Sequence, residues 1–199
     1  MPVPKDGNAP PKSMRFEILP GLPPYGPPAI SFSERGEREF REGLVVRFYP
    51  RNSDPWVGNF LGGIVDYTTV LDHPNGIDVV VVAAGNTCIV DPEHQAIRDR
   101  IASDTGRVIP LSSLGLIVFQ GLVDFSAVRS DNLRWTSPRI SWDSFRNTDV
   151  HETKLTGEAW TPVGDAWVPF TLDLLTGCCT DGIYEIDMAR ALRVTSKED

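Results

Sequence analysis

The sequence predicts an all-β protein, mainly antiparallel, arranged as a sandwich, a barrel or a propeller-like stack of sheets, with one short surface helix. Three observations support this prediction. About a dozen short segments rich in β-branched and aromatic residues are separated by turn signals that recur roughly every 8 to 12 residues. The valine-rich run Ile77–Ala84 has the length and composition of a strand buried on both faces. Helical spacing of apolar residues occurs in one segment, 93–103.

The run Ile77–Ala84 opens a predicted β-hairpin. Gly85-Asn86 tolerates the positive φ angles that a tight turn requires, and Thr87–Val90 forms the second strand. Asp91-Pro92 ends that strand, because proline has no N–H to donate to a neighbouring strand.

The same pattern of strand, turn and strand occurs at residues 122–136 and 167–186. Aligning the second strands places Cys88, Trp135 and Tyr184 at equivalent positions, 47 and 49 residues apart. Near-equal spacing of this length predicts a repeated multi-stranded unit. Residues 138–143 are the candidate third strand of the second unit.

The predicted helix spans Glu93–Ser103. Ile97 and Ile101 stand four residues apart, Asp91 is placed to cap the first turn, and Pro92 suits the first helical position.

Composition divides the chain into three parts. Residues 1–28 hold nine of the seventeen prolines and are predicted to form a partly disordered arm, extended over the body from Met14 onward. Residues 29–191 form a single β-rich domain, and residues 192–199 are a polar tail.

A net charge of −8 argues against nucleic acid and anionic membranes as partners, and it would favour encounter with a basic protein. The N-terminal residues contain no apolar signal segment, and no run approaches the length of a membrane span. Three cysteines, two of them adjacent, do not make a disulfide framework. We therefore expect a cytoplasmic protein.

The hairpin around Gly85-Asn86-Thr87-Cys88-Ile89-Val90-Asp91 is similar to a β-propeller blade. Its ending, Val90-Asp91-Pro92-Glu93, looks like the strand ends of quinoprotein-type or NHL-type blades. The resemblance covers residues 56 to 187, about three units, and lacks a WD dipeptide with its partner Gly-His. Since a closed ring normally needs four or more blades, the resemblance implies that another copy completes the ring or that no ring forms.

Local motifs for catalysis are absent from the sequence. No GxSxG, phosphate-binding loop, GxGxxG or HExxH pattern is present, and His73, His94 and His151 do not have zinc-ligand spacing. Asp78, Asp124 and Asp173 each interrupt an apolar strand, so they either point into a shared polar channel or face solvent at sheet edges. We expect no cofactor and no metal, which favours a non-enzymatic protein.

Tryptophan, arginine and aspartate gather between residues 124 and 170 and supply the predicted binding residues. Tryptophan and arginine dominate the hot spots of protein interfaces, so we expect a protein partner and a binding protein of the bacterial-cytosol type, one version being an immunity- or antitoxin-like inhibitor of a basic partner. The alternatives are a carbohydrate-binding or carbohydrate-active protein that stacks sugars on tryptophan, and a structural subunit that assembles with itself, for example as a homodimer. The candidate residues are Trp135, Arg139, Trp142, Trp160, Asp124 and Asp143.

Overall fold

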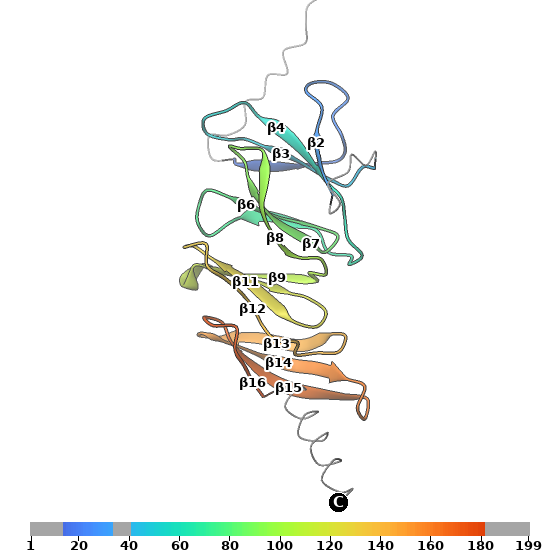
Figure 1. The fold of residues 1–199 in the computed structure, drawn as a ribbon, viewed down its shortest axis with the longest axis vertical. Helices are drawn as coiled ribbons and strands as arrows, with labels where there is room; N and C mark the ends of the chain where they lie inside the picture. The colour runs from blue at the N-terminus through green and yellow to red at the C-terminus, as the bar shows by residue number, and fades with distance from the viewer. Residues whose placement is uncertain (1–13, 34–40, 182–199) are drawn as a thin grey trace, which may run out of the picture.

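The computed structural model describes residues 14–33 and 41–181, and this part of the chain is all-β (Figure 1). The described residues form sixteen strands in four four-stranded sheets, none of them closed into a barrel, and one short 3-10 helix at Ser112–Leu114. The predicted fold class is confirmed, with more strands than the expected dozen.

The first sheet has the strand order β1-β3-β4-β2, and β2 runs parallel to β4. Its strands are β1 (Phe16–Leu19), β2 (Ile30–Phe32), β3 (Leu44–Phe48) and β4 (Trp56–Phe60). The N-terminal arm therefore contributes an edge strand, since β1 pairs with β3 along its whole length. Residues 1–13 of the arm and 192–199 of the tail lie outside the described residues.

The other three sheets are antiparallel meanders whose strands follow one another in chain order. The second contains β5 (Thr69–Asp72), β6 (Val79–Ala83), β7 (Asn86–Asp91) and β8 (Ala96–Ala102). The third contains β9 (Arg107–Leu111), β10 (Leu116–Gln120), β11 (Phe125–Arg129) and β12 (Arg134–Thr136). The fourth contains β13 (Phe145–His151), β14 (Lys154–Thr161), β15 (Ala166–Asp173) and β16 (Cys179–Thr180).

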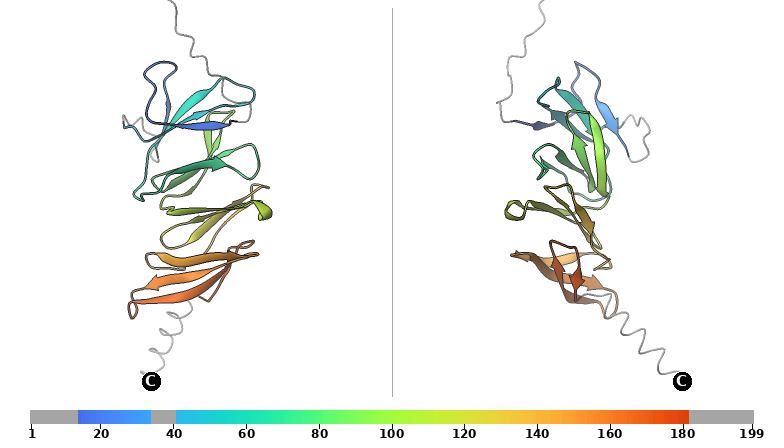
Figure 2. Two further views of the ribbon diagram at one scale, coloured as in Figure 1. Left: turned by 180° about the vertical axis from the view of Figure 1, so that it is seen from behind. Right: turned by 60° about the vertical axis from the view of Figure 1, so that its left-hand side comes forward.

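The four sheets stack face to face along the long axis of the molecule (Figure 2). A separate hydrophobic core fills each of the three spaces between neighbouring sheets. In β6, Val79 and Val81 pack toward the first sheet, whereas Val80 and Val82 pack toward the third. All five residues of β6 are buried, which confirms the prediction of a strand buried on both faces.

The predicted helix at 93–103 is wrong. Ile97 and Ile101 both belong to β8, but Ile97 packs against the core between the first and second sheets and Ile101 against the core between the second and third. The pairing of β8 with β7 shifts register twice, so the four-residue spacing does not mark a single apolar face. Asp91 does accept hydrogen bonds from the N–H groups of Glu93 and His94, at 3.0 and 3.2 Å, so it caps a tight turn rather than a helix.

The predicted repeat is also out of register. Cys88 lies in β7, the third strand of its sheet, whereas Trp135 lies in β12, the fourth strand of the next sheet, and Tyr184 is outside the described residues. The three meanders begin at Thr69, Arg107 and Phe145, so the period of the fold is 38 residues. Residues 138–143, predicted as a strand, belong to the connection between β12 and β13.

A buried charge network fastens the turn before β6 to the outer strand of the same sheet. The Arg98 guanidinium contacts two carboxylates: its Nε lies 3.1 Å from Asp78 Oδ1, and its Nη2 bonds Asp91 Oδ2. Asn75 donates to the second oxygen of Asp78 at 2.8 Å, and His94 Nδ1 lies 2.8 Å from Asp91 Oδ2. The network fixes one end of the second sheet.

Candidate functional site

The connection between β12 and β13, residues 137–144, joins the third sheet to the fourth and holds several of the predicted binding residues. We call it the Trp142 loop. The N–H groups of Ile140 and Ser141 both donate to Val123 O, at 2.8 and 3.0 Å, and Trp142 N–H donates to Trp160 O at 3.1 Å. The loop is therefore attached both to the third sheet and to the fourth.

Two buried side chains hold the Trp142 loop in one conformation. Ile140 packs into the core between the third and fourth sheets. The Ser141 hydroxyl is buried and donates to Ser144 O at 2.6 Å, while its oxygen accepts from the N–H groups of Asp143 and Ser144 at 3.3 and 3.2 Å. These backbone groups of the loop therefore have hydrogen-bond partners within the protein.

Arg139 and Trp142 form a stacked pair at the surface of this loop. Arg139 Nε donates to Ser141 O at 3.0 Å, and Nη2 donates to Trp142 O at 3.1 Å. These bonds place the guanidinium carbon 4.6 Å from the centre of the Trp142 ring, within the range of a cation–π interaction. Trp142 nevertheless remains 45% exposed, so the loop presents a large aromatic surface to solvent.

Carboxylates flank the stacked pair. Asp143 is exposed beside Trp142, and Asp124 is partly buried. Burial raises the pKa of Asp124, the Asp104 carboxylate raises it further, and the positive charge of Arg139 opposes both effects. Asp104 itself accepts a hydrogen bond from Leu122 N–H at 3.0 Å, which holds the loop between β10 and β11.

The other two predicted tryptophans have different surroundings. Trp160 contributes its backbone carbonyl to the Trp142 loop, but its indole bonds Asp165 Oδ1 at 3.1 Å and lies across from Trp167 on β15. Trp135 donates its indole N–H to Leu174 O at 3.0 Å and packs against Gly177, so it joins the third sheet to the fourth. The structure thus brings Arg139, Trp142 and Asp143 together, with Asp124 nearby, and places Trp135 elsewhere.

Sequence reasoning missed the pairing on the outer face of the fourth sheet. There, Arg146 lies over the Trp167 ring at 4.4 Å and forms an ion pair with Glu158 at 3.0 Å. The feature of the sequence that could have indicated this pairing is the two-residue alternation of β13 and β14, which places Arg146 opposite Glu158.

Asp78, Asp124 and Asp173 do not converge on a shared channel. Asp78 is buried against Arg98 just before β6, whereas Asp124 just precedes β11 of the third sheet, on the side of the Trp142 loop. Asp173 ends β15 and bonds the N–H groups of Leu175 and Thr176 at 3.0 and 2.9 Å, which closes a turn. Each carboxylate has its own local contacts.

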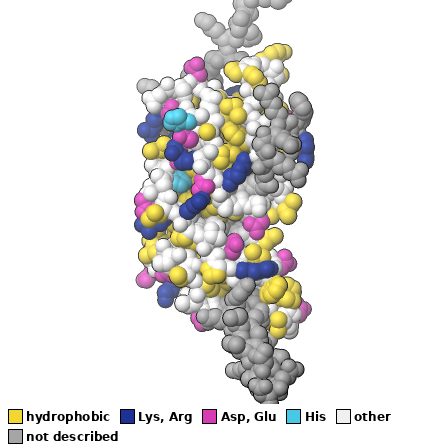
Figure 3. All heavy atoms as spheres, in the orientation of Figure 1, with side chains coloured by type: hydrophobic (Ala, Val, Ile, Leu, Met, Phe, Trp, Pro, Cys, Tyr) yellow, Lys and Arg dark blue, Asp and Glu magenta, His cyan; other side chains and the backbone are white. Residues whose placement is uncertain are grey.

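Surface charge is mixed on the face of the molecule seen in Figure 3, where acidic, basic and hydrophobic side chains are interspersed. Within residues 14–33 and 41–181, no three His, Cys, Asp or Glu side chains gather in a way that could hold a metal ion. The part of the chain that the structure describes contains no helix with the length and apolar character of a membrane span.

No protein-family model, no curated protein and no solved structure matches this chain.

Proposed function

We propose that this protein is a non-enzymatic binding protein that recognises a basic protein partner through the Trp142 loop. The observation that carries the proposal is the exposed Trp142 ring, held on the Arg139 guanidinium by a loop whose own hydrogen bonds are satisfied. Tryptophan and arginine are the residue types most enriched at interface hot spots. A loop ordered before binding loses little conformational entropy when a partner docks, which favours affinity.

Charge supports a basic partner. The chain carries a net charge of −8, which raises the rate of encounter with a cationic protein. Asp143 adjoins Trp142, Asp124 lies close to Arg139, and Asp104 lies close to Asp124, so these carboxylates could meet lysine or arginine side chains at the edge of the contact. An inhibitor of a basic toxin, of the immunity or antitoxin type, is the specific version of this proposal.

The test compares immobilised wild-type protein with the variant Trp142→Ala and with the matched control Trp167→Phe, whose indole contacts Arg146 on the outer face of the fourth sheet. Proteins that bind to the immobilised protein at low and at high salt are identified. Each candidate is then purified, and its affinity for wild type and for both variants is measured by calorimetry. We expect a basic partner whose affinity falls on the order of 30-fold or more with Trp142→Ala, as for a hot-spot residue, and is unchanged by Trp167→Phe. If every retained protein binds Trp142→Ala as tightly as wild type, the proposal fails.

A carbohydrate ligand is the second candidate, because an exposed tryptophan beside a carboxylate can also stack on a sugar ring and bond its hydroxyl groups. Trp142 and Asp143 are the residues that favour it. A tryptophan fluorescence titration with a glycan panel separates the two candidates. A saturable change that disappears with Trp142→Phe would support the sugar, and flat titrations across the panel would eliminate it.

Self-assembly is tested by light scattering at two protein concentrations. A mass that rises to a dimer, and falls back to the monomer with Trp142→Ala, would mean that the Trp142 loop binds a second copy rather than a different protein.

A further inference from the structure

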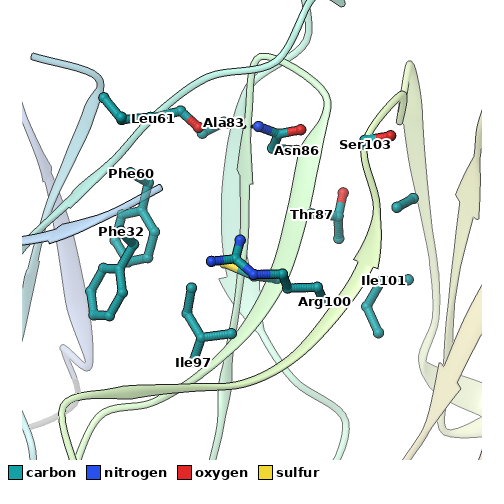
Figure 4. A pocket seen from close by; sticks show the side chains of 12 residues that line it. Phe32, Phe60, Leu61, Ala83, Asn86, Thr87, Ile97, Arg100, Ile101 and Ser103 are labelled. Carbon is teal, nitrogen blue, oxygen red and sulfur yellow. Dashed lines mark hydrogen bonds between the residues drawn. The ribbon is translucent and has the colours of Figure 1, made fainter. Parts of the chain in front are cut away.

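A pocket of about 200 Å³ lies between the first and second sheets, away from the Trp142 loop (Figure 4). One wall is formed by Phe32 of β2 and Phe60 of β4, whose rings stack with their centres 4.9 Å apart. Cys88 of β7 and Ile97 of β8 line the pocket from the second sheet. The pocket is therefore built from strands of two different sheets and is mainly apolar.

Arg100 supplies the positive charge of this pocket. It stands on β8 opposite Cys88, and in Figure 4 its guanidinium extends across the hollow toward the two phenyl rings. Its Nη2 donates to Ser33 O at 2.8 Å. Among the described residues, no aspartate or glutamate lines the pocket and no carboxylate forms an ion pair with Arg100. Arg98, two residues earlier on the same strand, contacts two carboxylates.

The remaining polar groups of the pocket do not compete with the Arg100 guanidinium for an anion. Burial raises the pKa of the Cys88 thiol to about 12, although the charge of Arg100 opposes this, so the sulfur is neutral at physiological pH. The Asn86 amide donates to Leu61 O at 3.3 Å, and the Thr87 hydroxyl bonds that of Thr105 at 2.7 Å. Within residues 14–33 and 41–181, the guanidinium is thus the one charged group that lines the pocket.

The size of the pocket limits what it can hold. An apolar cavity of about 150 Å³ admits a benzene molecule. A volume of about 200 Å³ therefore suits a benzene-sized group with a short substituent. Arginine binds carboxylates through paired N–H groups, and such charge-assisted bonds are stronger than neutral ones.

We propose that this pocket binds a small organic carboxylate, with the apolar part of the ligand between the phenyl rings and Ile97 and its carboxylate on Arg100. The inference does not depend on the function proposed for the Trp142 loop, because the two sites share no residue.

The test is a titration of the ¹⁵N-labelled full chain, followed by NMR, with three ligands of the same shape: 3-phenylpropionate, 3-phenylpropan-1-ol and 3-phenylpropylamine. We expect saturable shifts of the Ala83, Cys88 and Arg100 amides with the carboxylate, with a dissociation constant on the order of 1 mM or tighter for a ligand of this size. The alcohol should bind on the order of 10-fold more weakly, and the amine should not bind, because each lacks the charge that pairs with the guanidinium.

Two arginine variants complete the experiment. Arg100→Met keeps the aliphatic stem and should weaken binding of the carboxylate to the level of the alcohol in wild type. The control Arg107→Met removes an exposed arginine that bonds Thr148 Oγ1 at 2.7 Å outside the pocket, and should leave binding unchanged. Equal affinity of wild type for acid and alcohol, shifts confined to residues outside the pocket, or no saturable shift at all would each overturn the proposal.

Discussion

The buried charge network of the second sheet allows a quantitative prediction for the substitution Arg98→Met. The Arg98 side chain is 50% exposed, whereas the side chains of Asp78 and Asp91 are only 2% and 8% exposed. Methionine retains most of the aliphatic stem but removes the positive charge. Two carboxylates would then remain in a poorly hydrated site with only hydrogen bonds from neutral groups and from His94.

The expected cost follows from this geometry. Removing one partner of a fully buried ion pair costs about 3–5 kcal/mol. Because half of the Arg98 side chain is exposed, water already screens part of the attraction, and we expect the free energy of unfolding to fall by about 2–3 kcal/mol. For a chain of this length, that loss lowers the Tm by about 5–10 °C.

Urea denaturation followed by circular dichroism measures the effect. The double variant Asp78→Asn with Arg98→Met should lose less stability than the sum of its two single variants, because the neutral amide no longer needs the guanidinium. The control Arg134→Met breaks an exposed ion pair with Asp99 and should cost less than about 1 kcal/mol. A loss below about 1 kcal/mol for Arg98→Met, or strict additivity in the double variant, would refute this reasoning.

Four further substitutions test other parts of the structure. Val80→Ala and Val81→Ala should each lower the free energy of unfolding by about 2 kcal/mol, although the side chains face different sheets, because both are completely buried; a near-zero loss for either would contradict the double-sided core. Gly177→Ala should cost at least ~1 kcal/mol and alter the near-UV circular dichroism, because the residue has a φ of +74° and its new Cβ would lie 2.6 Å from the Trp135 ring; an unchanged spectrum and Tm would contradict this contact. Asp124→Asn should raise the Tm at pH 7, because burial and the Asp104 charge raise the pKa of Asp124 in the folded protein and so penalise its charged form. That gain should disappear below about pH 3.9, where the carboxyl is protonated in both states; a lower Tm of the variant at pH 7 would contradict the assignment.

The strands were predictable where hydrophobicity alone decides burial. The run of four valines in β6 has no polar face, and a strand with no polar face must be covered on both sides. The turn at Ala84-Gly85, where both residues have positive φ, was predicted one residue away from its true position.

The predictions of a helix and of the repeat period were wrong for physical reasons. Two apolar residues four apart are too few to define one face of a helix, and Ile97 and Ile101 pack against different cores. The 38-residue period begins at Thr69, Arg107 and Phe145, which share neither size nor polarity, because sheet packing constrains which face a residue occupies more than its identity.

The two candidate sites differ in how well they could be predicted from the sequence. Arg139, Trp142 and Asp143 are close in the chain and lie in one loop, so composition alone grouped them. The pocket of Arg100 depends on Phe32 and Phe60, which approach it only because the first and second sheets stack. No local pattern encodes that approach.

The stacking of the four sheets has a consequence for how the molecule comes apart. Each core joins only two neighbouring sheets, so the protein behaves as a one-dimensional chain of coupled units rather than as a body with a single centre. Detaching the fourth sheet uncovers one core, whereas disrupting the second or third uncovers two. Opening should therefore proceed inward from the ends, and the amide protons of β6 and β10 should exchange with solvent last.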